Sequence, residues 1–430
     1  MLNERLYHAF IVDDDKYLYM TNYKQLFLIS DQEYKFLESP DSRSYVLDKY
    51  AELINEIDAK QAVKREDRRF GLFLCVSNSC NAKCRYCFAH QGDYGRDRGF
   101  MPAKMAYKAI DCFMSKVPYY ADAYIIFFGG EPLMAFDTIC DACEYTKLNY
   151  CGVKDFKFQV VTNATLLTEK MIDYFADNDF GIAVSIDGGS SIQNKQRPLA
   201  NGKDSYFEAT KNLSYLLNSI YNVHARGTYI DFDYPLPKLY SELLNLGFRE
   251  VDIPPDILHL KNSEQMNALM QQLDALYLSI LDYMNGHEDF PFGLFTTEIR
   301  RLFIPKLDSP YSCGVGKTTF SVDINGNLYP CHRFCTDDDK LYGNIMNESS
   351  IEFKEYHFVD NKCRDCWNQY TCSHGCAYND VHNTDGTYAK HIFWCCYAKK
   401  MTELTLALCA RMKPDTLRRV LCIPKTLTIS

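Results

Sequence analysis

The sequence predicts an α/β protein whose central part is a partial (β/α)6 TIM-like barrel. Short apolar runs recur along the chain, helical segments separate them, and each strand–helix step has the length of a crossover unit. We expect a small N-terminal α+β module over residues 1–69, the barrel over 70–290, and a Cys-rich C-terminal extension over 291–430.

The leading module is expected to contain strands and then helices. Strands are predicted at 8–12, 17–20 and 24–29, around turn-forming aspartates. Ser30 resembles an N-cap with Glu33 three residues later, so a helix should begin there and run toward Leu37. A second helix is expected from about Ser44 to Val63.

Six barrel strands are predicted from short apolar runs, as for parallel strands that are covered on both faces. They span 70–76, 124–128, 157–162, 181–186, 224–230 and 250–253. Helices are expected near 102–117, 136–149, 168–178, 205–219 and 237–245, and a longer helix near 263–285 leads into the C-terminal region.

Composition narrows the class of protein. The 430 residues are 47% hydrophobic, which is enough for a large core. A formal net charge of -9 argues against a nucleic-acid partner. No uncharged apolar stretch approaches the roughly 18 residues that suggest a membrane span, and the first residues lack the pattern of a secretion signal. We therefore expect a cytoplasmic protein without a membrane partner.

The 19 cysteines are numerous for such a protein, and in a reducing compartment clustered cysteines indicate metal or redox chemistry. Cys80, Cys84 and Cys87 follow the first barrel strand with the spacing C-x3-C-x2-C. Three thiolates on one loop can bind three irons of a [4Fe-4S] cluster and leave the fourth iron to a small molecule. A zinc loop is the alternative.

This segment resembles the radical S-adenosylmethionine (SAM) superfamily, whose members hold SAM on the open iron and cleave it to a 5′-deoxyadenosyl radical. Four later segments, at the ends of the second to fourth strands and just beyond, are similar to family motifs. They are Gly129-Gly130-Glu131-Pro132, Thr162-Asn163 (with Ala164 where the family usually has glycine), the pair Ser185 and Asp187, and Arg197. The resemblance implies SAM contacts by Tyr86, Gly129, Gly130, Glu131, Asn163, Ser185, Asp187 and Arg197.

The C-terminal cysteines resemble a SPASM extension, which carries two auxiliary [4Fe-4S] clusters. Cys313 and Cys331 flank Gly326, and a C-x2-C-x5-C-x3-C run begins at Cys363. The segment 320–331 reads as a hairpin with its turn at Asn325-Gly326. The resemblance assigns Cys313, Cys331 and Cys376 to the nearer cluster, and Cys363, Cys366, Cys372 and Cys395 to the outer one.

Three points about these clusters stay open. Cys396 rivals Cys395 as the last ligand. Either Cys335 closes the nearer cluster or one iron stays open, and an open iron would favour thioether formation with a substrate thiolate. A zinc ribbon is the alternative to the clusters.

The resemblance implies a peptide maturase with three [4Fe-4S] clusters and SAM as cofactors. It would form a thioether, carbon–carbon or related crosslink in a ribosomally made precursor peptide, with a reductant such as flavodoxin or ferredoxin. The leading module favours this reading, because a leader peptide can add a strand to its sheet edge. The alternatives are an anaerobic sulfatase-maturating enzyme that makes formylglycine, and a non-catalytic metal-stabilised scaffold or redox sensor. The sequence identifies no catalytic acid or base.

Overall fold

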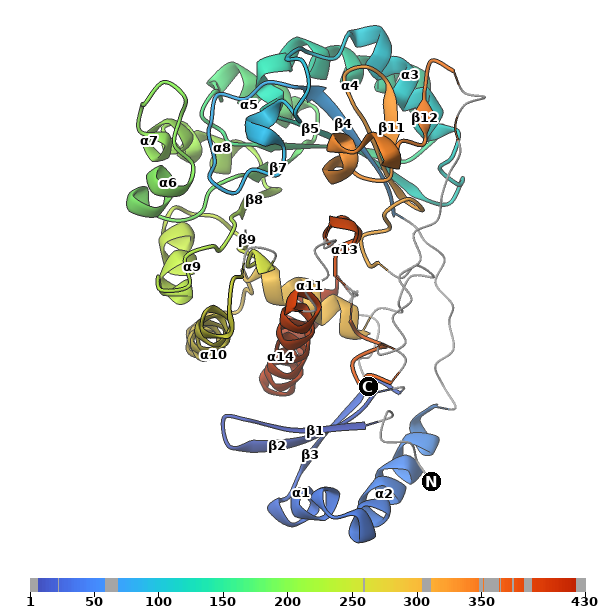
Figure 1. Ribbon diagram of the computed structural model, residues 1–430, viewed down its shortest axis with the longest axis vertical. Helices are drawn as coiled ribbons and strands as arrows, with labels where there is room; N and C mark the ends of the chain where they lie inside the picture. The colour runs from blue at the N-terminus through green and yellow to red at the C-terminus, as the bar shows by residue number, and fades with distance from the viewer. Residues whose placement is uncertain are drawn as a thin grey trace.

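The computed structural model describes residues 7–21, 23–58, 69–257, 260–303, 311–347, 351, 363, 365–372, 375–382 and 389–422. Its two sheets are a three-stranded antiparallel sheet near the N-terminus and a nine-stranded mixed sheet that contains the barrel strands. Figure 1 shows them at opposite ends of the molecule, with helices between them.

The N-terminal sheet is formed by β1 (Tyr7–Val12), β2 (Asp15–Met20) and β3 (Gln25–Ile29), and α1 (Asp31–Glu38) and α2 (Pro40–Asp58) follow. The predicted capping box is confirmed: the Ser30 hydroxyl accepts from the Glu33 amide, and the Glu33 carboxylate accepts from the Ser30 amide. The second helix begins four residues before the predicted Ser44, because proline suits a first helical turn. Its predicted end at Val63 lies outside the described residues.

The barrel strands lie side by side in chain order and are all parallel, which confirms the predicted partial barrel. They are β4 (Arg69–Ser77), β5 (Asp122–Gly129), β6 (Phe156–Thr162), β7 (Gly181–Val184), β8 (Val223–Arg226) and β9 (Val251–Asp252). Their outer sides pack on α3 (Ala103–Met114), α4 (Phe136–Tyr150), α5 (Glu169–Asp177), α6 (Ser190–Gln196), α7 (Ser205–Thr210), α8 (Leu213–Ser219) and α9 (Leu236–Asn245).

Three details of the barrel differ from the prediction. The helix expected over 205–219 is divided into α7 and α8. β8 ends at Arg226 rather than residue 230, and β9 has only two residues, because the sheet narrows toward this edge. The short helix α6 was not predicted, and it carries the chain from the end of β7 toward Arg197.

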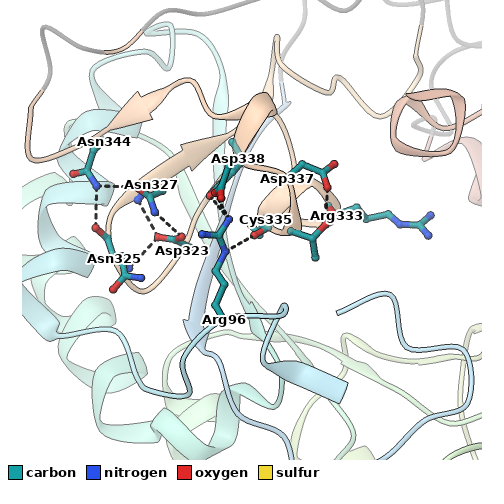
Figure 2. A network of polar contacts seen from close by, with 11 residues as sticks. Arg96, Asp323, Asn325, Asn327, Arg333, Cys335, Asp337, Asp338 and Asn344 are labelled. Atoms are coloured by element: carbon teal, nitrogen blue, oxygen red, sulfur yellow. Dashed lines mark hydrogen bonds and ion pairs between the residues drawn. The ribbon is translucent and has the colours of Figure 1, made fainter. Parts of the chain in front are cut away.

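The C-terminal region joins the barrel sheet. β10 (Thr319–Val322) lies parallel to β4, with Phe320 opposite Leu72. β11 (Asn327–Tyr329) pairs antiparallel with β10, which confirms the predicted hairpin, and its loop spans four residues that end at Gly326. Figure 2 shows Asp323 at the centre of this turn, where its carboxylate accepts from the amides of Asn325 and Asn327. β12 (Gly343–Asn344) completes this edge of the sheet.

Long helices connect the two sheets. α10 (Ser263–Gly286) and α11 (Gly293–Phe303) pack against α14 (Ala389–Arg411), and α13 (Ala377–His382) and α15 (Pro414–Leu421) flank them. The His8 ring in β1 stacks on Trp367 at 3.6 Å between centroids, and its Nε2 lies 2.7 Å from the Glu403 carboxylate on α14. One face of the small sheet therefore packs on the main body, and the other packs on α1 and α2. No described helix combines the length and apolar character that a membrane crossing requires.

Candidate functional site

The loop after β4 carries Cys80, Cys84 and Cys87, and backbone hydrogen bonds attach it to a distant segment. The Lys83 amide donates to the Pro198 carbonyl at 2.7 Å, and the Arg85 amide donates to the Gln196 carbonyl at 3.0 Å. The Ala200 amide returns a bond to the Asn81 carbonyl at 2.9 Å. The segment that follows α6 thus pairs with the cysteine loop almost as a strand would, which the sequence analysis did not predict.

The three thiols share one low-dielectric neighbourhood. Burial, together with negative charge on Glu131, Cys84 and Cys87, raises the pKa of Cys80 to about 12. Burial also raises the pKa of Cys84. Because burial disfavours the thiolate form of Cys80 and Cys84, a positively charged group such as a metal centre would be needed to stabilise these thiolates.

The three thiol side chains on this loop fit the ligand set of an iron–sulfur cluster. Among the described residues, no three His, Cys, Asp or Glu side chains stand close enough to bind one metal ion. A four-iron cluster places its thiolates farther apart, because an iron atom stands behind each of them. The three cysteines would hold such a cluster, and its chemistry would be electron supply.

The Gly129-Gly130 pair lets the end of β5 lie directly on the end of β4. The Gly130 amide donates to the Ser77 carbonyl at 2.7 Å, and the Glu131 amide donates to the Ser79 carbonyl at 2.8 Å. A Cβ on Gly130 would overlap the Ser79 carbonyl oxygen. Close backbone approach explains why only glycine fits here.

The Glu131 carboxylate joins the ends of β5 and β6. It accepts from the Thr162 hydroxyl at 2.6 Å, the Asn163 amide at 2.8 Å and the Leu133 amide at 3.1 Å. Only 1% of Glu131 is exposed, and burial raises its pKa to about 7. Because protein donors occupy the carboxylate, the backbone around Glu131 is the part left for a ligand ammonium group. The Asn163 side chain lies 3.9 Å from Cys80 Sγ.

Asp187, which follows β7, contacts two of the other predicted site residues, Tyr86 and Arg197, and also Thr228. Its carboxylate accepts from the Tyr86 hydroxyl at 2.6 Å, from Arg197 Nη2 at 3.0 Å and from the Thr228 amide at 2.9 Å. The Arg197 guanidinium also lies over the Tyr86 ring, 5.3 Å from its centroid. Ser185, two residues before Asp187, is held at this edge by a 2.7 Å bond from its amide to the Thr162 carbonyl.

Arg197 keeps one donor for a ligand. Its Nε is buried and has no hydrogen-bond partner in the described part of the chain. A buried donor without a partner is costly unless a ligand satisfies it. A carboxylate group fits this position, and the methionine portion of SAM carries one.

The structure also brings Cys313, Cys331 and Cys376 into one neighbourhood. Burial, together with negative charge on Cys376 and Cys313, raises the pKa of Cys331 to about 12. Burial raises the pKa of Cys313 as well. These are the residues that the resemblance assigns to the nearer auxiliary cluster.

Cys335 lies elsewhere, against the barrel. Its Sγ is 3.9 Å from Cys75 Sγ on β4 and 3.4 Å from the Ser321 hydroxyl on β10. Cys75 and Cys335 are almost completely buried, at 0% and 1% exposure. The sequence analysis left Cys75 without a role, and no sequence signal pairs it with Cys335.

The outer cysteines lie on a compact loop that is fastened to α14. The Cys366 amide donates to the Cys363 carbonyl, and the Cys372 amide donates to the Asn368 carbonyl. The buried Asn368 side chain donates from its Nδ2 to the Ala398 carbonyl at 3.2 Å, and its Oδ1 accepts from the Thr402 hydroxyl at 3.1 Å. Cys395 precedes Ala398 by three residues and so shares its helix face, whereas Cys396 is turned away. This geometry supports Cys395.

The sequence analysis missed His332, which follows Cys331 on the 3-10 turn His332–Thr336. Its ring packs on Phe73 at 4.3 Å and on Phe128 at 4.5 Å between centroids. Its Nδ1 is buried without a partner among the described residues. Burial, helped by the positive charge of Arg333, lowers its pKa to about 3. The sequence signal that could have pointed to His332 is its position directly after Cys331.

Known proteins resemble this chain in sequence. Residues 74–232 match the profile of the radical SAM superfamily. An uncharacterized protein of Methanocaldococcus jannaschii is 30% identical over 252 residues, which cover 56% of this chain and 84% of that protein. A cysteine-type anaerobic sulfatase-maturating enzyme of Clostridium perfringens is 24% identical over 345 residues, which cover 70% of this chain and 86% of the enzyme.

Solved structures share the fold at low sequence identity. The structure of anSMEcpe with bound AdoMet has a TM-score of 0.65 at 20% identity, over 82% of this chain and 98% of that one. Streptococcus suis SuiB bound to its precursor peptide SuiA has a TM-score of 0.52 at 14% identity, over 89% of this chain and 97% of that one.

Proposed function

This chain belongs to the radical SAM superfamily, and from that premise we propose that it is a maturase that crosslinks a ribosomally made precursor peptide. SAM held at the first cluster would supply a 5′-deoxyadenosyl radical that takes one hydrogen atom from the substrate, while the second electron would pass to an auxiliary cluster and the proton to solvent. Tyr86, Asp187 and Arg197 would hold SAM, together with the backbone of Gly129, Gly130 and Glu131. The single observation that carries the peptide assignment is the unpaired edge of the N-terminal sheet.

That edge is β3. The strand order is β1-β2-β3, β1 is docked on α14 and Trp367, and no other described strand pairs with β3. Leu28 on β3 is 66% exposed, on the sheet face that elsewhere packs against the main body. An extended leader peptide can add to such an edge through main-chain hydrogen bonds and cover the exposed side chain. SuiB, which has a similar fold, has been solved with its precursor peptide.

We favour a thioether as the crosslink because of Cys335. The assignment of three cysteines to the nearer cluster leaves one iron without a protein thiolate, and Cys335 is engaged with Cys75 and Ser321 instead. Every cysteine of the chain is among the described residues. A cysteine thiolate of the substrate is a suitable ligand for an iron of this kind.

The second candidate is an anaerobic sulfatase-maturating enzyme, and similarity to the Clostridium perfringens enzyme over 70% of this chain supports it. Its product is an aldehyde rather than a crosslink, so the products separate the two candidates. The scaffold or redox-sensor alternative predicts no SAM site, and the buried unpartnered donor of Arg197 argues against it.

The test is anaerobic reconstitution with iron and sulfide, followed by dithionite, SAM and a candidate precursor peptide encoded beside this gene. We expect 5′-deoxyadenosine and a peptide that is lighter by two hydrogen atoms. One cysteine of that peptide should no longer react as a free thiol, because its sulfur is bonded to carbon. An aldehyde that reacts with a hydrazine probe on a sulfatase peptide would favour the second candidate. Loss of 5′-deoxyadenosine in the Cys80→Ala, Cys84→Ala and Cys87→Ala variants is the control.

A peptide lacking its leader should bind at least tenfold more weakly.

A further inference from the structure

Arg333 lies between the two cysteine groups nearest the barrel. It follows Cys331 and His332, and its guanidinium carbon is 5.2 Å from the Phe88 ring centroid and 4.7 Å from that of Tyr378. Phe88 follows Cys87 on the first cysteine loop, and Tyr378 stands two residues after Cys376. Arg333 therefore contacts the protein around both groups at once.

The guanidinium is directed at a cysteine. Arg333 Nη1 lies 3.8 Å from Cys376 Sγ. Figure 2 shows the side chain extending away from the Arg96–Asp338 ion pair, so the acidic residues of that turn do not neutralise it. Its Nε is buried without a hydrogen-bond partner among the described residues. A cation that is partly desolvated between two aromatic rings exerts a strong field on an adjacent anionic sulfur.

We propose that Arg333 is the residue that sets the reduction potential of the nearer auxiliary cluster, by donating a charge-assisted hydrogen bond to the Cys376 thiolate. This inference rests on the proposed assignment of Cys376 to that cluster. One-electron reduction adds a negative charge, which a fixed cation stabilises, so Arg333 raises the reduction potential. Hydrogen bonds to the sulfurs are a principal means by which proteins tune such clusters.

The experiment isolates the auxiliary clusters by combining Cys80→Ala, Cys84→Ala and Cys87→Ala, and follows their reduction by EPR-monitored redox titration. In this background Arg333→Met removes the charge but keeps the stem, and Arg333→Lys keeps the charge. We expect the midpoint potential of one cluster to shift to a more negative value in the Met variant. The Lys variant should keep the midpoint potential close to that of the protein with Arg333. Arg249→Met, which removes an arginine stacked on Tyr221 away from the cysteines, should change nothing.

The possible failures are distinguishable. If the triple-alanine protein binds no iron, the auxiliary clusters and the proposed function fail together, whatever Arg333 does. If it binds iron and the Met variant keeps the original midpoint potentials, the role of Arg333 is refuted. Should the Met variant lose iron, Arg333→Gln retains an N–H donor without charge. A Gln variant with unshifted potentials would likewise overturn the inference.

Discussion

The buried Asp187 carboxylate accepts hydrogen bonds from Tyr86, Arg197 and the Thr228 amide, so a change at this residue disturbs three contacts of the site. Asp187→Asn should lower the free energy of unfolding by about 3 kcal/mol, because it leaves the Arg197 charge buried without a partner. SAM affinity should fall at least tenfold in equilibrium dialysis. Tyr86→Phe, which removes one donor, should cost about 1 kcal/mol. An Asn variant as stable as the wild type in urea would contradict this account.

The buried carboxyl group of Glu131 should make the stability of the folded protein depend on pH. Burial raises its pKa from 4.5 to about 7 in the folded protein. Between these two values the folded state binds a proton that the unfolded state has lost, so stability falls as pH rises and then levels off above pH 7. The expected loss is on the order of 3 kcal/mol. Urea unfolding of the metal-free protein from pH 4.5 to 8 measures it, and Glu131→Leu should remove this component of the slope.

Among the elements, the junction of β4 and β5 should be intolerant of any side chain at Gly130. Gly130→Ala places a methyl group against the Ser79 carbonyl, so the loop that carries Cys80 must shift. We expect iron bound at the first cysteine group to fall several-fold, with 5′-deoxyadenosine formation falling in proportion. Gly286→Ala, at the end of α10 with no atom near its Cβ, is the matched control. Normal iron loading of the Gly130 variant would refute the packing argument.

Sequence patterns predicted the elements where the signal is local. The Ser30–Glu33 capping box places the start of α1, and apolar runs place all six barrel strands. Two residues that the resemblance marks as SAM contacts, Tyr86 and Asp187, also lie together in the structure, although no sequence pattern predicted that contact. Helix α14 escaped prediction because it packs against α10, α11 and β1 and lacks a simple apolar stripe. The contact of Cys75 with Cys335 joins residues 260 positions apart, and no local pattern encodes such a contact.

Across the whole molecule, Arg411 links the N-terminal sheet to the main body. Its guanidinium lies 2.6 Å from the Asp15 carboxylate, 3.6 Å from that of Asp13 and against the Tyr277 hydroxyl on α10. Arg411→Met should cost up to about 1 kcal/mol, since these carboxylates are half-exposed. Hydrogen exchange should speed up in β1 and β2 while the barrel strands stay protected. Arg418→Met, which breaks a pair within α15, should leave β1 and β2 unchanged.

The parallel pairing of β10 with β4 has a consequence for biosynthesis. Ser321 bonds to Phe73 across 248 positions of sequence, so the first barrel strand leaves the ribosome long before its neighbour on that side exists. Loop closure over such a span is slow, and an unpaired strand edge is open to wrong partners meanwhile. A nascent chain that stops before residue 319 would present β4 as an exposed edge beside the first cysteine loop. We therefore expect β4 to gain its neighbour on this side only after residue 322 has left the ribosome.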